Sequence, residues 1–263
     1  MIPIGCGCSH NCSYCYAKSL LDFRNLWNPL NPRVADIKKI EKQIQKIPQN
    51  TVVRLGGMTD CFQAFENIYG ITYQTIQMLN KRRIHYLIVT KSDLVASDKY
   101  IEILDKELAH IQISLTSTND KTAFEYEKAP SSSRRIIAIE KLNELGFDVT
   151  LRLSPFIFSL IDFDKLNSIK CDKILVEFLR VNTFIKRWFK EVDFSDYTVK
   201  QSNYLHLPLD KKIKQISYIT GFDELTVCED VTEHYQYWQE NVNFNKDDCC
   251  NLRYLPESNI KVA

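Results

Sequence analysis

Residues 134–153, RRIIAIEKLNELGFDVTLRL, contain two successive patterns that together decide the fold class. Apolar residues recur every three positions from Ile136 to Leu142, which places them on one face of a helix. Gly146 is a residue that commonly terminates a helix. Asp148–Leu153 is a short run of β-branched and aliphatic residues, typical of a strand buried in a parallel sheet. The stretch therefore predicts one helix followed by one strand.

The same alternation extends along the chain in both directions. Short runs rich in Val, Ile, Leu or Thr are separated by helical spacings, which is typical of βα units around a parallel sheet. We therefore expect an α/β fold. Beyond about residue 178 the sequence is more aromatic and less periodic, so we expect a unit of residues 1–180 and an appended C-terminal capping region of residues 181–263. The other strand-like runs are Thr51–Leu55, His85–Thr90, His110–Leu115, Lys173–Phe178 and Leu225–Cys228.

Composition excludes several classes of protein. The chain has 263 residues, of which 44% are hydrophobic and 25% charged, with a formal net charge of +1. No apolar run is long enough to span a membrane, and the first residues lack the pattern of a secretory signal. We therefore expect a cytoplasmic globular protein without a membrane partner. The near-zero net charge gives no support for nucleic-acid binding through bulk electrostatics.

Cysteine is the unusual residue in this sequence. There are nine cysteines, an odd number, and we expect a reducing compartment, so metal or thiol chemistry is favoured over disulfides. Cys8, Cys12 and Cys15 form a C-x3-C-x2-C pattern in CSHNCSYC. A structural zinc site normally has four ligands, often in paired C-x2-C units. Three thiolates on a compact loop can instead hold three corners of a cubane iron–sulfur cluster and leave one iron open to a chelating ligand.

This segment resembles the signature of the radical S-adenosylmethionine superfamily, in which an aromatic residue, here Tyr14, precedes the third cysteine. Within that superfamily the chain is similar to the spore photoproduct lyase-like group. The segments that carry the similarity extend from the start of the chain to about residue 180. They are Gly5–Lys18, Gly56–Glu66, Val89–Ser92, Ile113–Ser114 and Phe124–Pro155.

The resemblance implies a fold, cofactors and partners. The fold would be a partial (β/α)6 TIM-type barrel whose first strand is Met1–Ile4. A [4Fe–4S] cluster on Cys8, Cys12 and Cys15 would bind S-adenosylmethionine and cleave it reductively to a 5′-deoxyadenosyl radical, with a one-electron donor such as flavodoxin or ferredoxin. The group implies a nucleobase or nucleic-acid lesion as substrate. A small molecule or peptide beneath residues 181–263 is the alternative, and a non-catalytic iron–sulfur or zinc protein is a third.

The resemblance also implies cofactor-binding residues at the carboxyl ends of the strands, where barrel enzymes place their chemistry. The backbone near Tyr14 would face the adenine, and a glycine turn at Gly56 and Gly57 would meet the amino group of S-adenosylmethionine. The carboxylate would contact Lys91 and Arg152, while Ser114 would contact the ribose or the carboxylate. An ordinary turn, surface salt bridges and a satisfied strand-end serine are the corresponding alternatives.

Tyr16 and Cys61 are the candidates for hydrogen transfer. Tyr14 and Tyr16 match tyrosines that flank the third cysteine in the lyase, although packing beside the cluster would also explain them. The lyase's hydrogen-donating cysteine falls on Met58, which has no S–H, and Cys61 is the nearby alternative unless it is a buried inert thiol. Since the printed chain also has no large segment ahead of the loop, the lyase's full mechanism is not expected here.

A second iron–sulfur cluster is a further possibility in the cysteine inventory. Its ligands would be Cys228, Cys249 and Cys250, completed by Cys61 or Cys6. Adjacent cysteines are poor joint ligands, and no C-x2-C unit accompanies them, so spacing alone does not establish this site. The ninth cysteine, Cys171, is expected in the core.

Overall fold

The computed structural model describes residues 7–245, 248, 250 and 252. Its core is a six-stranded sheet in the order β1-β2-β3-β4-β5-β8, and every neighbouring pair is parallel. Each strand-like run of the sequence is a strand of this sheet. The strands are β1 (Val52–Leu55), β2 (His85–Thr90), β3 (Ala109–Leu115), β4 (Asp148–Phe156), β5 (Lys173–Phe178) and β8 (Glu224–Cys228).

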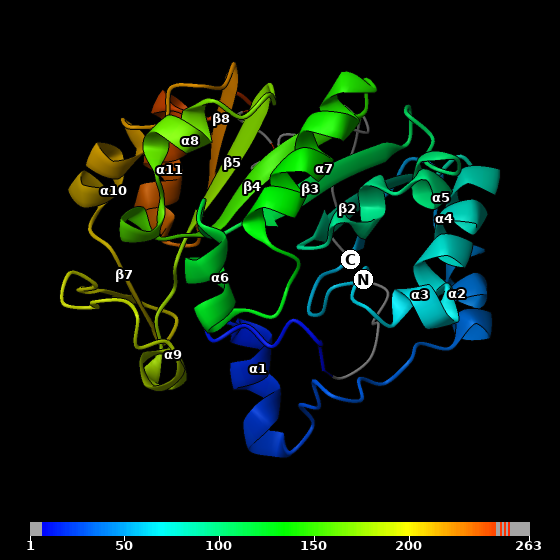
Figure 1. The fold of residues 1–263 in the computed structure, drawn as a ribbon, viewed down its shortest axis with the longest axis horizontal. Helices are drawn as coiled ribbons and strands as arrows, with labels where there is room; N and C mark the ends of the chain where they lie inside the picture. The colour runs from blue at the N-terminus through cyan, green and yellow to red at the C-terminus, as the bar shows by residue number, and fades with distance from the viewer. Residues whose placement is uncertain (1–6, 246–247, 249, 251, 253–263) are drawn as a thin grey trace.

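Helices lie on the outside of the curved sheet (Figure 1). The principal contacts of this layer are α7 on β3 and β4, α4 on β2 and α11 on β8. The helices are α1 (Tyr16–Leu21), α2 (Ile37–Ile44), α3 (Glu66–Tyr69), α4 (Ile71–Lys81), α5 (Asp98–Ile101), α6 (Asp120–Tyr126), α7 (Ser132–Glu144), α8 (Phe163–Asn167), α9 (Thr183–Trp188), α10 (Leu209–Ile216) and α11 (Thr232–Asn241), with short 3-10 turns at Asp22–Arg24, Asp93–Ala96 and Phe158–Leu160.

The quoted helix–strand unit folds as its patterns predict. The Ser131 side chain accepts a hydrogen bond from the Arg134 N–H at the start of α7. Ile139 and Leu142 are fully buried on its inner face. Gly146 has a φ of +77°, a conformation that favours glycine, and β4 starts two residues later. This unit lies at the centre of the sheet, with α7 as its outer layer.

The sheet is open, with β1 and β8 as its edges among the described residues, so the fold is a partial TIM-type barrel as predicted. The predicted first strand, Met1–Ile4, lies outside the described residues. The boundary predicted at residue 180 does not separate the sheet from the rest of the chain, because β8 pairs with β5. Residues beyond 180 also form an antiparallel hairpin of β6 (Val199–Gln201) and β7 (Tyr204–His206). Among the described residues, no helix combines the length and apolar character needed to cross a membrane.

A buried polar chain crosses the amino ends of the central strands. Asp148 is its centre: one carboxylate oxygen lies 2.5 Å from His110 Nδ1, and the other accepts a hydrogen bond of 2.8 Å from Lys173 Nζ. His85 Nδ1 lies 3.3 Å from His110 Nε2 on the adjacent strand. The strand register brings these groups together, since His110 is directly opposite Asp148. This end of the barrel is therefore closed by paired charges.

Candidate active site

The three motif cysteines lie on a loop that ends at the start of α1. Cys8 and Cys12 are buried, and Cys15 is half-buried. The Cys15 thiol caps α1 by accepting a hydrogen bond of 3.5 Å from the Lys18 N–H. Burial, with the nearby Asp60 carboxylate, raises the pKa of the Cys8 thiol to about 12. The motif therefore brings thiols to the protein interior.

The segment after β1 holds this loop from one side. The Ser9 N–H donates to Gln63 Oε1 at 2.8 Å, and His10 Nδ1 lies 3.4 Å from Asp60 Oδ2. Asp60 also accepts hydrogen bonds from the Lys91 N–H at 2.6 Å and from the Thr90 hydroxyl at 2.7 Å. Burial acts to raise the pKa of Asp60, but His10 and these donors lower it by more than burial raises it. The net pKa is lowered, so the carboxylate stays ionised. Asp60 thus joins the cysteine loop to the end of β2.

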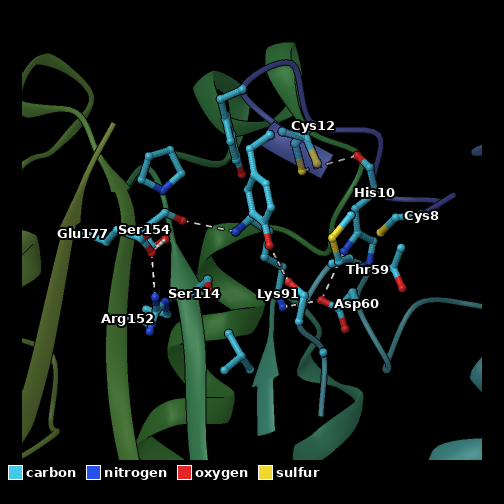
Figure 2. Close-up of a pocket in the computed structure, with 18 of the residues that line it drawn as sticks. Cys8, His10, Cys12, Thr59, Asp60, Lys91, Ser114, Arg152, Ser154 and Glu177 are labelled. Carbon is cyan, nitrogen blue, oxygen red and sulfur yellow. Dashed lines mark hydrogen bonds and ion pairs between the residues drawn. The ribbon is translucent and has the colours of Figure 1, made fainter. Parts of the chain in front are cut away.

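A cavity of about 360 Å³ lies between the cysteine loop and the carboxyl ends of the strands. Figure 2 shows Cys8 and Cys12 on one side of it and Ser154 and Arg152 on the other, with Lys91 between them. The cavity brings together every predicted site residue except Cys61. These residues are Cys8, Cys12, Tyr14, Cys15, Tyr16, Gly56, Gly57, Lys91, Ser114 and Arg152.

The glycine turn after β1 is required by its surroundings. Gly56 has a φ of +83°, and a Cβ at this position would lie 2.3 Å from the Val89 carbonyl oxygen. Any larger residue would force β1 and β2 apart. The Gly57 carbonyl accepts a hydrogen bond of 2.8 Å from the Tyr16 hydroxyl. The turn therefore exposes backbone to the cavity and also positions Tyr16.

The predicted cations differ in how they are paired. Lys91 Nζ donates to the Ser154 carbonyl at 3.2 Å. The Arg152 guanidinium is buried and donates to Gln112 Oε1 and Glu177 Oε2, each at 2.6 Å. The alternative of a surface salt bridge is thus wrong for Arg152. Its two hydrogen bonds fix its orientation at the cavity wall.

The two tyrosines of the motif have different environments. The Tyr14 hydroxyl donates to the carboxylate of the buried Glu127, and its ring packs against Tyr126 and Phe189. Tyr16 is half-buried in the cavity wall, and Arg180 lies over its ring at 5.4 Å. The hydroxyl of Tyr14 is therefore engaged in the core, whereas the ring of Tyr16 belongs to the cavity wall.

The structure does not bring Cys61 to the cavity. Cys61 is 2% exposed, and its thiol lies behind the glycine turn, 3.5 Å from where a Cβ on Gly56 would be. Burial raises its pKa well above the usual value. The predicted alternative of a buried, inert thiol fits this placement. Met58 and Cys228 do line the cavity.

Sequence reasoning missed Arg54, which lies on β1 and lines the cavity. Its Nε is buried without a hydrogen-bond partner, and within the described residues its guanidinium has no ion pair. Val53 and Leu55 are buried, whereas Arg54 between them is half-buried, the alternation expected for side chains on opposite faces of a strand. A charged residue inside an apolar strand, two positions before Gly56, was the available signal.

Comparison with known proteins adds the family. Residues 2–160 match the family model described as the Radical SAM superfamily. The chain belongs to the radical SAM superfamily. An uncharacterized protein of Methanocaldococcus jannaschii, MJ0683, is 28% identical over 166 residues, which is 60% of this chain and 60% of that protein. The chain thus spans about 60% of the length of this curated relative.

Solved structures of radical SAM proteins share the fold. Spore photoproduct lyase complexed with dinucleoside spore photoproduct superimposes with a TM-score of 0.62 at 17% identity, over 86% of this chain and 76% of that chain. SuiB of Streptococcus suis bound to S-adenosylmethionine gives a TM-score of 0.55 at 16% identity, over 93% of this chain and 52% of that chain. These likenesses confirm the predicted architecture, and the predicted resemblance to the lyase-like proteins is confirmed at the level of structure.

Membership in this superfamily implies a [4Fe–4S] cluster and S-adenosylmethionine, and the residues present suit them. The donors are three thiols on one short loop facing one cavity, which is the ligand set that an iron–sulfur cluster prefers. In the described part of the chain no three His, Cys, Asp or Glu side chains surround a single metal position. Figure 2 shows His10 between Cys8 and Cys12.

A second cluster gains no support. Cys6 and Cys249 lie outside the described residues. Cys61 is enclosed behind the glycine turn, whereas Cys228 ends β8 at the opposite edge of the sheet. Among the described residues, no group of three such side chains is placed to hold a metal ion.

Proposed function

We propose that this radical SAM enzyme uses Cys8, Cys12 and Cys15 to hold a [4Fe–4S] cluster and acts on a nucleobase or nucleic-acid lesion. A bound cluster would supply one electron for the reductive cleavage of S-adenosylmethionine into methionine and a 5′-deoxyadenosyl radical, and this radical would abstract a hydrogen atom from the substrate. The observation that carries the proposal is the single cavity that joins the cysteine loop to the carboxyl ends of the strands.

The chain's own residues bind, orient and exclude water. The glycine turn at Gly56 lets backbone groups approach the cofactor closely. Lys91 places an ammonium group in the cavity, where a carboxylate would be its natural partner. The Arg152 guanidinium, held by Gln112 and Glu177, lines the cavity beside Lys91. A one-electron donor such as flavodoxin or ferredoxin would reduce the cluster.

Arg54 supports a substrate that carries a negative charge. Arg54 is half-buried, and its buried Nε has no hydrogen-bond partner, which costs free energy, so an anionic ligand group near Arg54 would be favoured. Tyr16 and Trp27 contribute half-buried aromatic rings to the same cavity wall. Aromatic rings and arginine together are the side chains on which bases stack and phosphates bind. These features favour a nucleotide unit over an uncharged substrate.

The enzymatic proposal is tested by anaerobic reconstitution with iron and sulfide, followed by dithionite and S-adenosylmethionine. The expected product is 5′-deoxyadenosine, measured by chromatography. A reconstituted protein that contains the cluster but forms no 5′-deoxyadenosine would refute the enzymatic role, and a protein that takes up only zinc would support the non-catalytic alternative.

The substrate class is tested separately, by titrating a short single-stranded oligothymidylate into the reconstituted protein at low salt. We expect salt-dependent binding that weakens about tenfold in Arg54→Gln, because one charge-assisted contact is removed. The matched control is Arg83→Gln, since Arg83 is exposed and pairs with Asp105 and Glu107 away from the cavity.

A small molecule or peptide is the second candidate, favoured by the contribution of residues beyond 180 to the cavity wall. Ile185 on α9, Cys228 at the end of β8 and Asp230 after it all line the cavity. A cavity wall completed by residues from this region suits a substrate that is enclosed rather than bound along a surface. Absence of oligonucleotide binding at low salt would reject the nucleic-acid substrate and leave this candidate.

A further inference from the structure

Three successive residues at the end of α6 hold the cysteine loop from the side opposite Asp60. The Ser13 N–H donates to the Tyr126 carbonyl at 2.8 Å, and the Lys128 N–H donates to the His10 carbonyl at 2.7 Å. Between these two backbone contacts, the Glu127 carboxylate accepts the hydroxyl hydrogen bond of Tyr14. The loop is therefore fixed on both sides of Cys12 by a segment more than 110 positions away in sequence.

Glu127 is held in turn by a buried arginine. The Glu127 and Arg135 side chains are each 1% exposed and form an ion pair, and Arg135 Nη1 also donates to the Ser114 carbonyl at 2.8 Å. Burial acts to raise the pKa of Glu127, but the charges of Arg135 and Lys91 lower it by more than burial raises it, so the net pKa is lowered. A continuous chain of contacts thus runs from Tyr14 through Glu127 and Arg135 to the end of β3.

An enclosed ion pair needs an explanation other than stability. Taking two charges out of water costs several kcal/mol each, and an apolar pair of similar volume is often as stabilising. Buried polar groups with defined partners do, however, impose one arrangement on the elements that they join. Here the joined elements are the cysteine loop, α7 and β3, and their meeting point is the wall of the cavity.

We propose that Glu127 and Arg135 are positioning residues that set the conformation of the cysteine loop for cluster binding. They act through Tyr14, beside the backbone contacts that Tyr126 and Lys128 make with Ser13 and His10, and neither lines the cavity. The inference rests on the proposed function only in assigning the cluster to this loop. Its structural half, that the pair orders the loop, holds for the metal-free chain as well.

Hydrogen exchange of the metal-free protein tests the structural half. In Glu127→Gln, we expect the peptide that covers residues 8–16 to exchange about tenfold faster, because the carboxylate that holds Arg135 and Tyr14 is lost. Glu66→Gln is the matched control, since Glu66 is also buried and accepts a 2.6 Å hydrogen bond from a tyrosine, Tyr100, but contacts α4 and α5 instead of the loop. Unchanged exchange at residues 8–16 in Glu127→Gln, or equal acceleration there in Glu66→Gln, would overturn the proposal.

The reconstituted protein tests the functional half. We expect Glu127→Gln to retain less iron and to alter the electron paramagnetic resonance line shape of the reduced cluster, while Glu66→Gln keeps the wild-type spectrum. Tyr14→Phe, which removes only the hydroxyl, should shift the spectrum in the same direction by less. A wild-type spectrum in Glu127→Gln would overturn the proposal. If the wild-type chain itself binds no cluster while Glu127→Gln still loosens the loop, the proposed function fails and the ordering of the loop by Glu127 stands.

Discussion

The two ends of the parallel sheet bury charged residues in opposite ways. At the amino ends, Asp148 is shared by His110 and Lys173 at 2.5 and 2.8 Å, and no cavity separates these groups. At the carboxyl ends, charged residues line a cavity, and Arg54 has a buried Nε without a partner. Buried charges that satisfy one another support the fold. A buried charge that faces a cavity without a partner indicates where a ligand binds.

The intermediate case is the wall formed by Arg152. Glu177 accepts hydrogen bonds from Arg152 at 2.6 Å and from the Ser154 hydroxyl at 2.8 Å, and its other oxygen lies 3.6 Å from Arg180. Burial acts to raise the pKa of Glu177, but the two arginines reduce it to about 2. These charges are paired like those of the amino ends, yet they line the cavity. The carboxyl end thus combines a fixed polar wall with a cation, Arg54, that has no ion pair among the described residues.

The strongest test of this comparison is removal of a cysteine from each end. Cys12→Ala should lose the cluster and all 5′-deoxyadenosine formation, because two thiols cannot retain the cluster. Cys171→Ala should keep both, since Cys171 is a core residue beside the first residues of β5. The iron content of each reconstituted variant measures cluster retention. The thermal midpoint of each metal-free variant measures the stability of the fold. Full cluster assembly in Cys12→Ala would contradict the assigned ligands.

The next prediction concerns Asp148 at the amino ends of the strands, where the buried charges are paired. Asp148→Asn should lower the free energy of unfolding by about 3 kcal/mol, because Lys173 and His110 lose a buried charge partner. Urea unfolding of the metal-free protein measures this loss, and the reconstituted variant should still assemble its cluster. The control is Asp98→Asn, whose side chain is 88% exposed and should leave the urea midpoint unchanged. Loss of the cluster in Asp148→Asn would mean that the two ends are not independent.

The same carboxylate predicts how stability depends on pH. Burial acts to raise the pKa of Asp148, but His110 and Lys173 lower it from the ordinary 3.8 to about 2. As pH falls, the unfolded chain takes up this proton before the folded chain does. The contribution, about 2 kcal/mol, is therefore complete above the ordinary pKa and disappears between it and about pH 2.

Urea midpoints at about pH 5 and about pH 3 provide the measurement. The difference in stability between wild type and Asp148→Asn should shrink at the lower pH. An equal difference at both values would show that the Asp148 carboxylate is not held at a depressed pKa. Glu177 responds in the same window, so the comparison must be made between these two chains and not on wild type alone.

The sheet could be predicted from sequence because its signal is local. Strands such as β3, buried along their whole length, read as continuous apolar runs between helical spacings. The cysteine motif could be recognised for the same reason, since its three cysteines lie within eight residues of one another. The order of the strands could not be predicted, because the pairing of β8 with β5 depends on tertiary packing, although the Leu225–Cys228 run itself was expected to be a strand.

The contacts that sequence missed join residues far apart in the chain. Glu127 reaches Tyr14 across 113 positions, and Lys91 reaches Ser154 across 63. Spacing from the third cysteine led to Met58, and Cys61 was suggested as the nearest thiol, but nearness in sequence does not determine the direction of a side chain, and Cys61 lies behind Gly56. Arg54 illustrates the same point, since only the strand's position beside the cavity reveals that its guanidinium has no partner among the described residues.

The smallest expected effect is also the sharpest test of the contrast between paired and unpaired charges. Arg54→Gln removes a partly desolvated cation that has no partner, so the metal-free protein should be no less stable and should gain up to about 1 kcal/mol. Arg135→Gln removes a cation of similar size that is paired with Glu127. The Arg135→Gln protein should be less stable than wild type, because Glu127 would remain buried and uncompensated. Urea unfolding of the two variants gives the comparison directly. Equal destabilisation would mean that Arg54 supports the fold, and its assignment to an anionic substrate group would lose its physical basis.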